Sequence, residues 1–304
     1  KVEFIAKFIM KNRMSAMAVA SSLALLSILM PPISIVSSAA VALVTLRRGA
    51  IEGLWVLMSA SVASAALGII VLGDYQFALA YALILWLPVW LLSIALREGK
   101  HLSLAIEIAA VLGVLAVLGF YLFVSSPVTY WQEILALMIE PMRQAQDIPL
   151  EQIEATIKTV SKYMTGILAA GSVTGLLLGL LLARWWQSKL YNPGGFKAEY
   201  LSLQMSQRFT FATLLVFLIA FLTSGSIAEV ASNVAVILFM LYSFIGMAVA
   251  HSLIANMKAK RFLLPAFYML VFVIPHIVIP VAIIGLTDTW LNLRKHIKPP
   301  TGTE

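Results

Sequence analysis

Long apolar runs, separated by short polar or charged stretches, form the hydropathy pattern of the chain. A helix that spans a bilayer needs about 20 mostly apolar residues, and backbone polar groups cannot stay unpaired in lipid. The pattern therefore predicts an all-α fold, a polytopic transmembrane helical bundle of about eight to nine spans plus interfacial amphipathic helices. The predicted spans are residues 14–30, 33–46, 51–73, 77–96, 102–124, 162–184, 209–224, 228–250 and 262–286.

Residues 129–160 carry too many charges to span. Apolar side chains cluster between the charged ones, which predicts a helix in the outer interface that breaks at Pro141 and restarts after Pro149. No internal repeat or separate soluble domain divides the sequence. We therefore expect residues 1–304 to form a single integral membrane domain.

A second polar segment, residues 190–208, opens with a turn motif. Pro193 fixes one backbone dihedral angle, and Gly194 and Gly195 allow positive φ after Asn192, so the chain is expected to turn sharply. We predict a cytoplasmic elbow and, up to the end of this segment, an amphipathic interfacial helix. The alternative is a backbone nest at the glycines that binds an anion such as a phosphate headgroup.

Composition supports the membrane class, because 61% of the 304 residues are apolar, 12% are charged and the mean hydropathy is +0.96. The sequence has no cysteine, which excludes disulfides, thiolate metal sites and a cysteine nucleophile. The motifs of zinc hydrolases, serine hydrolases and phosphate-binding loops are absent, and the histidines lack ligand spacing. We therefore expect no metal, no cofactor and no enzymatic activity.

The net charge of +7 comes from Lys and Arg in short loops, which is a topology signal rather than a nucleic-acid surface. These loops are expected to face the cytoplasm. The interpretation is a multi-pass protein of the bacterial inner (cytoplasmic) membrane with a cytoplasmic N-terminus, in contact with the lipid bilayer and with no nucleic-acid partner. Three basic residues do not fit this orientation, because they would face outward if nine spans cross: Arg294, Lys295 and Lys298.

Small residues recur at every fourth position in two predicted spans, which places them on one helix face. The sixth span carries the predicted helix-packing positions Gly171, Gly175 and Gly179. The first span carries Ala16, Ala20 and Ala24. We interpret this alanine face as a docking surface for a membrane coupling subunit or a second copy of the chain, with packing inside the bundle as the alternative.

His276 is the foremost candidate for ligand binding, because it lies near the middle of the last predicted span. Pro275 and Pro280 leave backbone carbonyls there without amide partners. A titratable imidazole beside free carbonyls suits a substrate or proton site. The alternative is a histidine bonded to a neighbouring helix at a kink, and an imidazole facing lipid would argue against this site.

Other polar or aromatic residues extend the candidate site. Asn233 and Asp74, near outer ends of their spans, are expected to line an outward-facing pocket. For Tyr81 and Trp86, a pocket wall and a packed core are both open. Glu107 is either a ligand contact or a carboxylate that snorkels to the cytoplasmic interface.

Three stretches resemble a known family: LYNPGGFKAEY at residues 190–200, LRRG at 46–49 and GLTDTWLNLR at 285–294. They are similar to the YybS-like family of bacterial inner-membrane proteins over nearly the whole chain. That family is distantly similar to the S components of energy-coupling-factor transporters. The resemblance implies a small-molecule pocket that opens outward, a first-helix alanine face that docks a coupling subunit, and a cytoplasmic tail in which Asp288 pairs with Arg294.

These observations lead to three hypotheses of function. The first is a transport-related protein that binds a small-molecule or lipid-like ligand in its bundle, as the substrate-binding component of a larger transporter. The second is a non-transporting scaffold or assembly factor that recruits membrane proteins. The third is a lipid-modifying enzyme, which would need a pocket uniting Glu107, His276 and a metal.

Overall fold

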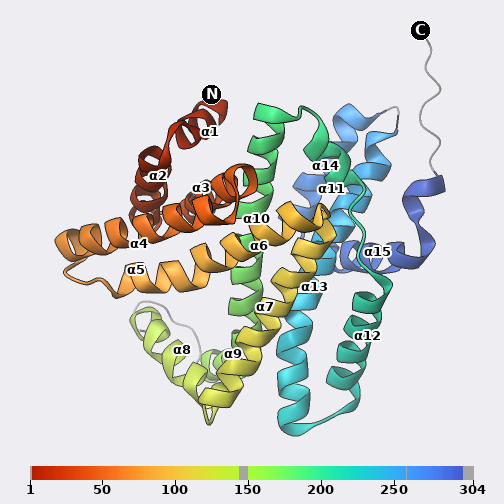
Figure 1. Ribbon diagram of the computed structural model, residues 1–304. Coiled ribbons are helices and arrows are strands. Elements are labelled where there is room, and N and C mark those ends of the chain that lie inside the picture. The colour runs from red at the N-terminus through yellow and green to blue at the C-terminus, as the bar shows by residue number, and fades with distance from the viewer. Residues whose placement is uncertain (1, 144–149, 258, 297–304) are drawn as a thin grey trace.

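The computed structural model describes residues 2–143, 150–257 and 259–296, and within these ranges the chain is helical and contains no strand (Figure 1). The elements are α1 (Val2–Lys11), α2 (Arg13–Leu26), α3 (Ile33–Arg48), α4 (Ala50–Leu72), α5 (Gln76–Tyr81), the π-helix η1 (Ala82–Trp86), α6 (Leu87–Gly99), α7 (Leu102–Phe123), α8 (Pro127–Arg143), α9 (Leu150–Ser161), α10 (Met164–Tyr191), α11 (Gly195–Leu201), α12 (Gln207–Leu222), α13 (Gly225–Ala255), α14 (Lys260–Val273), the 3₁₀ turn η2 (Pro275–Ile277), α15 (Val278–Leu291) and the 3₁₀ turn η3 (Leu293–His296).

The membrane-spanning capacity of the described residues is smaller than predicted. Five helices are long and apolar enough to cross, namely α4, α5 to α6, α7, α10 and α13, or six if the bent pair of α14 and α15 is one span. The eight to nine predicted spans are more than this. The reason is length: α2 has 14 residues and α3 and α12 have 16 each. At 1.5 Å per residue, the longest of these reaches about 24 Å, against roughly 30 Å of hydrocarbon.

Local sequence sets several helix ends. The side chain of Asn12 accepts a hydrogen bond from the Ser15 amide at 2.7 Å, which caps α2. Gly73 ends α4 with φ of 74°, a conformation that glycine adopts without a steric penalty. α9 begins directly after Pro149, at the predicted restart, whereas α8 runs through the expected break at Pro141 to Arg143.

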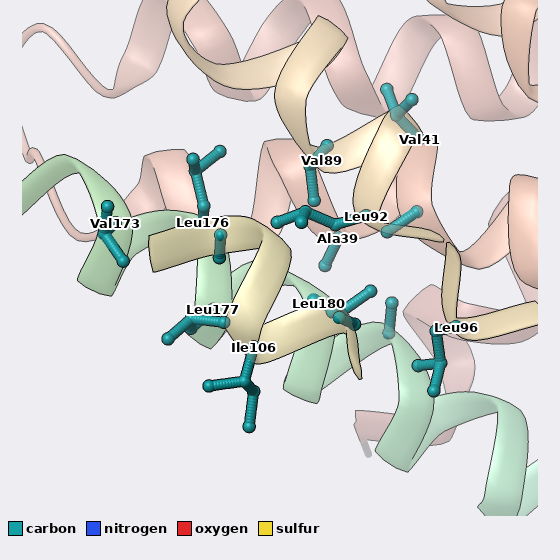
Figure 2. Packing of buried hydrophobic residues seen from close by; sticks show 14 of the residues in the cluster. Ala39, Val41, Val89, Leu92, Leu96, Ile106, Val173, Leu176, Leu177 and Leu180 are labelled. Carbon is teal, nitrogen blue, oxygen red and sulfur yellow. The ribbon is translucent and has the colours of Figure 1, made fainter. Parts of the chain in front are cut away.

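The core is built around α3, which packs against α2, α4, α6 and α10. All residues from Ser37 to Leu46 are buried. Figure 2 shows how Ala39 and Val41 of this helix meet leucine and valine side chains of α6 and α10. A short helix that lies inside the bundle therefore explains the second predicted span.

The closest helix crossing joins α13 and α15, which lie across each other in Figure 1. A Cβ atom added at Gly246 would overlap the carbonyl oxygen of Val281, and one at Gly285 would overlap the backbone of Tyr242. Only glycine permits this backbone contact.

The last predicted span, residues 262–286, is broken. α14 and α15 meet at Pro275 with a bend of 111°. The start of the pair lies near the elbow, because α14 directly follows α13, whose His251 lies beside Tyr200 of α11. The end of the pair lies there too, because Arg294, just beyond α15, donates to the carbonyls of Leu201 and Leu203. Both ends of the pair therefore lie at the elbow end of the bundle, an arrangement that favours a re-entrant loop over a broken span. Arg294 then lies on the same side as the elbow.

The elbow contains the turn expected from its sequence. Gly194 has φ of 90°, and the Gly195 amide donates to the carbonyl of Asn192 at 3.1 Å. The helix that follows is shorter than predicted, because α11 ends at Leu201 and a non-helical connection, in which Leu203 and Met205 are buried, leads to α12.

Candidate functional site

The candidate site is an apolar cavity of about 500 Å³ between η1 with α6, α7, α10 and the start of α8. Its lining consists of Leu83, Ile84, Pro88, Leu112, Gly113, Ala116, Val117, Phe120, Trp131, Thr165, Leu168, Ala169, Ser172, Val173 and Leu176. The π-helix η1 supplies two of these side chains. π-Helical turns are rare in proteins, and those that occur are often found at functional sites. The position of η1 on the cavity wall therefore points to a role in binding.

A few polar groups stand among these apolar side chains. The indole nitrogen of Trp131 donates to Thr165 Oγ1 at 2.8 Å, which ties α8 to the start of α10. Trp131 also stacks on Phe120, with ring centroids 5.4 Å apart. Ser172 Oγ donates to the carbonyl of Leu168 at 2.9 Å. Thr165 and Ser172 thus offer hydroxyl groups to a cavity whose other walls are hydrocarbon.

Tyr81, which directly precedes η1, and Trp86, its last residue, do not belong to the cavity lining. Both are buried, and their rings meet edge to face at 5.1 Å. Trp86 Nε1 donates to Ser37 Oγ at 3.2 Å, and the Tyr81 hydroxyl contacts Ser27 Oγ at 3.3 Å. Of the two interpretations open from the sequence, the structure shows the packed core.

Asn233 is fully engaged inside the bundle. Its Oδ1 accepts from the Gly166 amide at 2.6 Å, and its Nδ2 lies within 3.0 Å of the Tyr121 hydroxyl and of the carbonyls of Lys162 and Glu229. An added Cβ at Gly166 would overlap the Asn233 backbone. The side chain therefore fastens α13 to the start of α10 and does not line the cavity.

Each of the two acidic candidates accepts a hydrogen bond from a backbone amide at or near the start of a helix. Glu107 accepts from the Ser206 amide at 2.9 Å, at the N-terminus of α12. Asp74 accepts from the Gln76 amide at 2.9 Å and closes the turn before α5. Neither belongs to the lining of the apolar cavity.

His276 lies on the turn η2 between α14 and α15 and is exposed, as are Pro275 and Pro280. Its imidazole makes no hydrogen bond within the described part of the chain. The half-buried Glu107 lies beside the start of α12, in a pocket whose lining does not include His276. The sequence candidates are therefore dispersed rather than gathered in one site.

A family model described as "Predicted membrane protein (DUF2232)" matches residues 18–289, most of the chain. The chain belongs to this family. A search of the curated proteins and a search of the solved structures each found no match. The match shows a membrane protein, and the likeness to the YybS-like family and to S components stays a prediction.

The alanine face in this DUF2232 chain is covered by its own helices. Ala16, Ala20 and Ala24 are fully buried where α2 packs against α3 and α4. Ser37 Oγ donates to the carbonyl of Ala20 at 2.7 Å across this contact. Internal packing, the alternative left open from the sequence, describes these residues.

The glycine face of α10 divides into two parts. Gly179 packs so closely on α3 that an added Cβ would overlap Ser38 Oγ. Gly171 and Gly175 have no heavy atom within 4 Å of an added Cβ. The helix-packing prediction therefore describes Gly179, whereas the other two glycines face open space.

Sequence reasoning missed the cavity-lining residues. Leu83 and Ile84 read as ordinary apolar span residues, and Trp131 lay in the segment assigned to the outer interface. The hydroxyl groups of Thr165 and Ser172, which lie two turns apart on the same face of α10, were a weak signal available in the sequence. Among the described residues, no group of three or more His, Cys, Asp or Glu side chains is placed to hold a metal ion.

Proposed function

We propose that the chain is a transport-related membrane protein that binds a small, largely apolar or amphiphilic ligand in the cavity between η1, α6, α7 and α10. The cavity is the observation that carries this proposal. Its volume of about 500 Å³ lies within the roughly 300 to 1,000 Å³ of small-molecule sites. Mostly apolar walls with a few polar groups are also typical of such sites.

The rim of the cavity indicates the route of entry. Leu83, Ile84 and Leu168 have exposed fractions of 55%, 56% and 44%, and all three line the cavity. An apolar rim on a bundle of membrane-spanning helices faces hydrocarbon. The ligand therefore enters from the lipid phase, which selects apolar or amphiphilic molecules.

The polar end of the cavity selects the head of such a ligand. Thr165 Oγ1 accepts from Trp131 and keeps its own proton to donate, while Ser172 Oγ has lone pairs free to accept. A ligand with one carbonyl or hydroxyl group at the end of an apolar body matches this arrangement.

The transport part of the proposal rests on the distant likeness to S components and on the cavity. The chain has no nucleotide-binding loop, so a partner subunit would supply energy. His276 lends no support to this function, because its exposed position lies outside the cavity lining. The proposal contains no chemical step.

Two phenylalanine variants on α10 test ligand binding. Ala169→Phe places a ring in the cavity, whereas Ile167→Phe, two residues away, lies outside the cavity lining and is the matched control. The purified proteins are extracted with organic solvent and the extracts compared by mass spectrometry. We expect a compound that is retained by the wild type and the control and is about tenfold depleted in Ala169→Phe.

Equal extracts from all three proteins would contradict ligand binding in this cavity. The transport part requires that movement of the compound across the membrane of intact cells depends on Ala169. Equal movement in wild-type and Ala169→Phe cells would leave a binding protein without a transport role.

A scaffold is the second candidate, and the open part of the α10 face favours it. Gly171 and Gly175 permit close approach of another helix, and the chain itself does not cover them. Cross-linking in membranes compares the wild type with Gly175→Leu. Loss of a stoichiometric partner from a folded variant would favour the scaffold, and an unchanged cross-linking pattern would argue against it.

A further inference from the structure

A second pocket lies at the elbow end of the bundle. It measures about 210 Å³ and is lined by Leu46, Leu96, Arg97, Lys100, Arg184, Gln187 and Glu199. The buried leucines Leu92, Leu177 and Leu180, labelled in Figure 2, lie between this pocket and the apolar cavity along α6 and α10. The two spaces are therefore separate, and the second is bounded by three cationic side chains and one anionic side chain.

Arg184 and Glu199 form one wall of the pocket. Arg184 Nε donates to Glu199 Oε2 at 2.8 Å, and Nη2 donates to Oε1 of the same carboxylate. Arg184 Nη1 donates to Gln187 Oε1 at 2.7 Å. This bidentate pair joins α10 to α11 across the elbow and neutralises one of the three cations.

Arg97 is held in place but is not neutralised within the pocket. Its Nη1 donates to the carbonyl of Leu46 at 2.8 Å, and Gln187 Nε2 donates to the same carbonyl at 3.2 Å. Its Nε lies 3.6 Å from Glu98, a carboxylate that is largely exposed and therefore screened by water. Nη2 makes no hydrogen bond within the described residues and is free to donate.

Lys100 is the second uncommitted cation. It ends α6 in the left-handed region with φ of 57°, a conformation that is unusual for a residue with a side chain, and its amide donates to the Leu96 carbonyl at 3.0 Å. Its ammonium forms no ion pair or hydrogen bond among the described residues. Lys100 and Arg97 line the same pocket, so both uncommitted cations are available to one ligand.

We infer that this pocket binds a phosphate group through the Arg97 guanidinium and the Lys100 ammonium. A guanidinium N–H donor, here Arg97 Nη2, and an ammonium point charge both bind phosphate oxygens in proteins. The pocket volume equals that of roughly seven water molecules in liquid water, which is enough for a partly hydrated phosphate. Arg47, whose guanidinium lies 4.0 Å over the Tyr191 ring, extends the positive field at this end of the bundle.

This inference goes beyond the proposed function, which concerns the apolar cavity. A lipid headgroup and a soluble phosphate ester share the recognised chemistry. Two measurements distinguish these sources.

The first measurement titrates the detergent-purified protein with inorganic phosphate at constant ionic strength and follows its thermal stability. The pocket variant is Lys100→Gln, which breaks no contact of the described residues, and the matched control is Lys189→Gln, which removes the same charge outside the pocket. We expect stabilisation of the wild type and the control, with about tenfold weaker phosphate binding in Lys100→Gln. Arg97→Lys, which keeps the charge without the fork, is expected to lie between them.

The second measurement uses native mass spectrometry to compare retention of phosphatidylglycerol with retention of diacylglycerol of the same chains. A Lys100-dependent preference for phosphatidylglycerol assigns the phosphate to a lipid headgroup. Phosphate binding without this preference assigns it to a soluble compound. The inference is overturned if neither probe depends on Lys100, or if Lys189→Gln weakens binding as much as Lys100→Gln.

Discussion

Glycines at two helix faces of this protein have opposite surroundings. Where α13 crosses α15, Gly246 and Gly285 bring the two backbones into direct contact. On α10, Gly171 and Gly175 face space that the chain does not fill. The same residue type therefore locks the crossing of α13 and α15 and leaves part of one face of α10 open. The spacing of small residues in the sequence does not distinguish these cases. It shows how closely another helix can approach the face, but not whether a helix packs there.

The largest expected effect breaks the locked crossing. Gly246→Val forces a side chain into the Val281 carbonyl, so α13 and α15 must separate, at a cost of about 5 kcal/mol or more because the overlap is with backbone. Thermal unfolding in detergent measures the loss. The matched control is Gly171→Val, which places the same side chain in open space. If both variants lost the same stability, helix propensity rather than the crossing would explain the effect.

The next effect concerns the ion pair that holds the end of α15. The Asp288 side chain is 1% exposed, and its Oδ2 lies 2.6 Å from Arg294 Nη2. The Arg294 guanidinium also donates to the carbonyls of Leu201 and Leu203. Arg294→Met leaves a buried carboxylate without its cation, which is expected to cost about 3 to 5 kcal/mol.

The control for this prediction is Arg13→Met, which removes an arginine from the more exposed pair with Glu52. Water screens such an exposed pair, so its loss is expected to change the free energy of unfolding much less. Denaturant titration of both variants measures the difference, and similar losses would show that burial does not strengthen the pair with Asp288.

The smallest expected effect sharpens the open side of the comparison. Gly171→Ala adds a methyl group that meets nothing within 4 Å, inside a helix where alanine is preferred to glycine. We expect a gain of about 0.5 to 1 kcal/mol. A loss of stability in the purified protein would show that another molecule or a second copy packs on this face.

Elements whose causes are local were predictable. The apolar runs located most helices. The chain turns at the elbow because Pro193 has a fixed φ and Gly194 adopts a positive φ without a steric penalty. The pairing of Asp288 with Arg294, implied by the family resemblance, is present in the structure. The span count was overestimated because hydropathy records how apolar a run is, whereas α3 is apolar through burial inside the protein.

The candidate site was less predictable. Asn233 and Glu107 are unusual residues for a membrane bundle, which made them candidates, yet each is satisfied by a backbone group far away in sequence. The residues that line the cavity are ordinary apolar residues, and no single position distinguishes them. A cavity is a property of several helices that fail to fill the space between them.

The sequence by itself determined that this protein is an α-helical membrane protein with basic short loops and a sharp elbow. These features follow from transfer free energies and backbone dihedral preferences, which act along one stretch of chain. Only the tertiary structure decided which small-residue face is covered, which polar groups are paired, and that Arg97 and Lys100 of one segment line a pocket with Arg184 of another. Those outcomes depend on contacts between residues remote in sequence, whose geometry is fixed only when the helices pack.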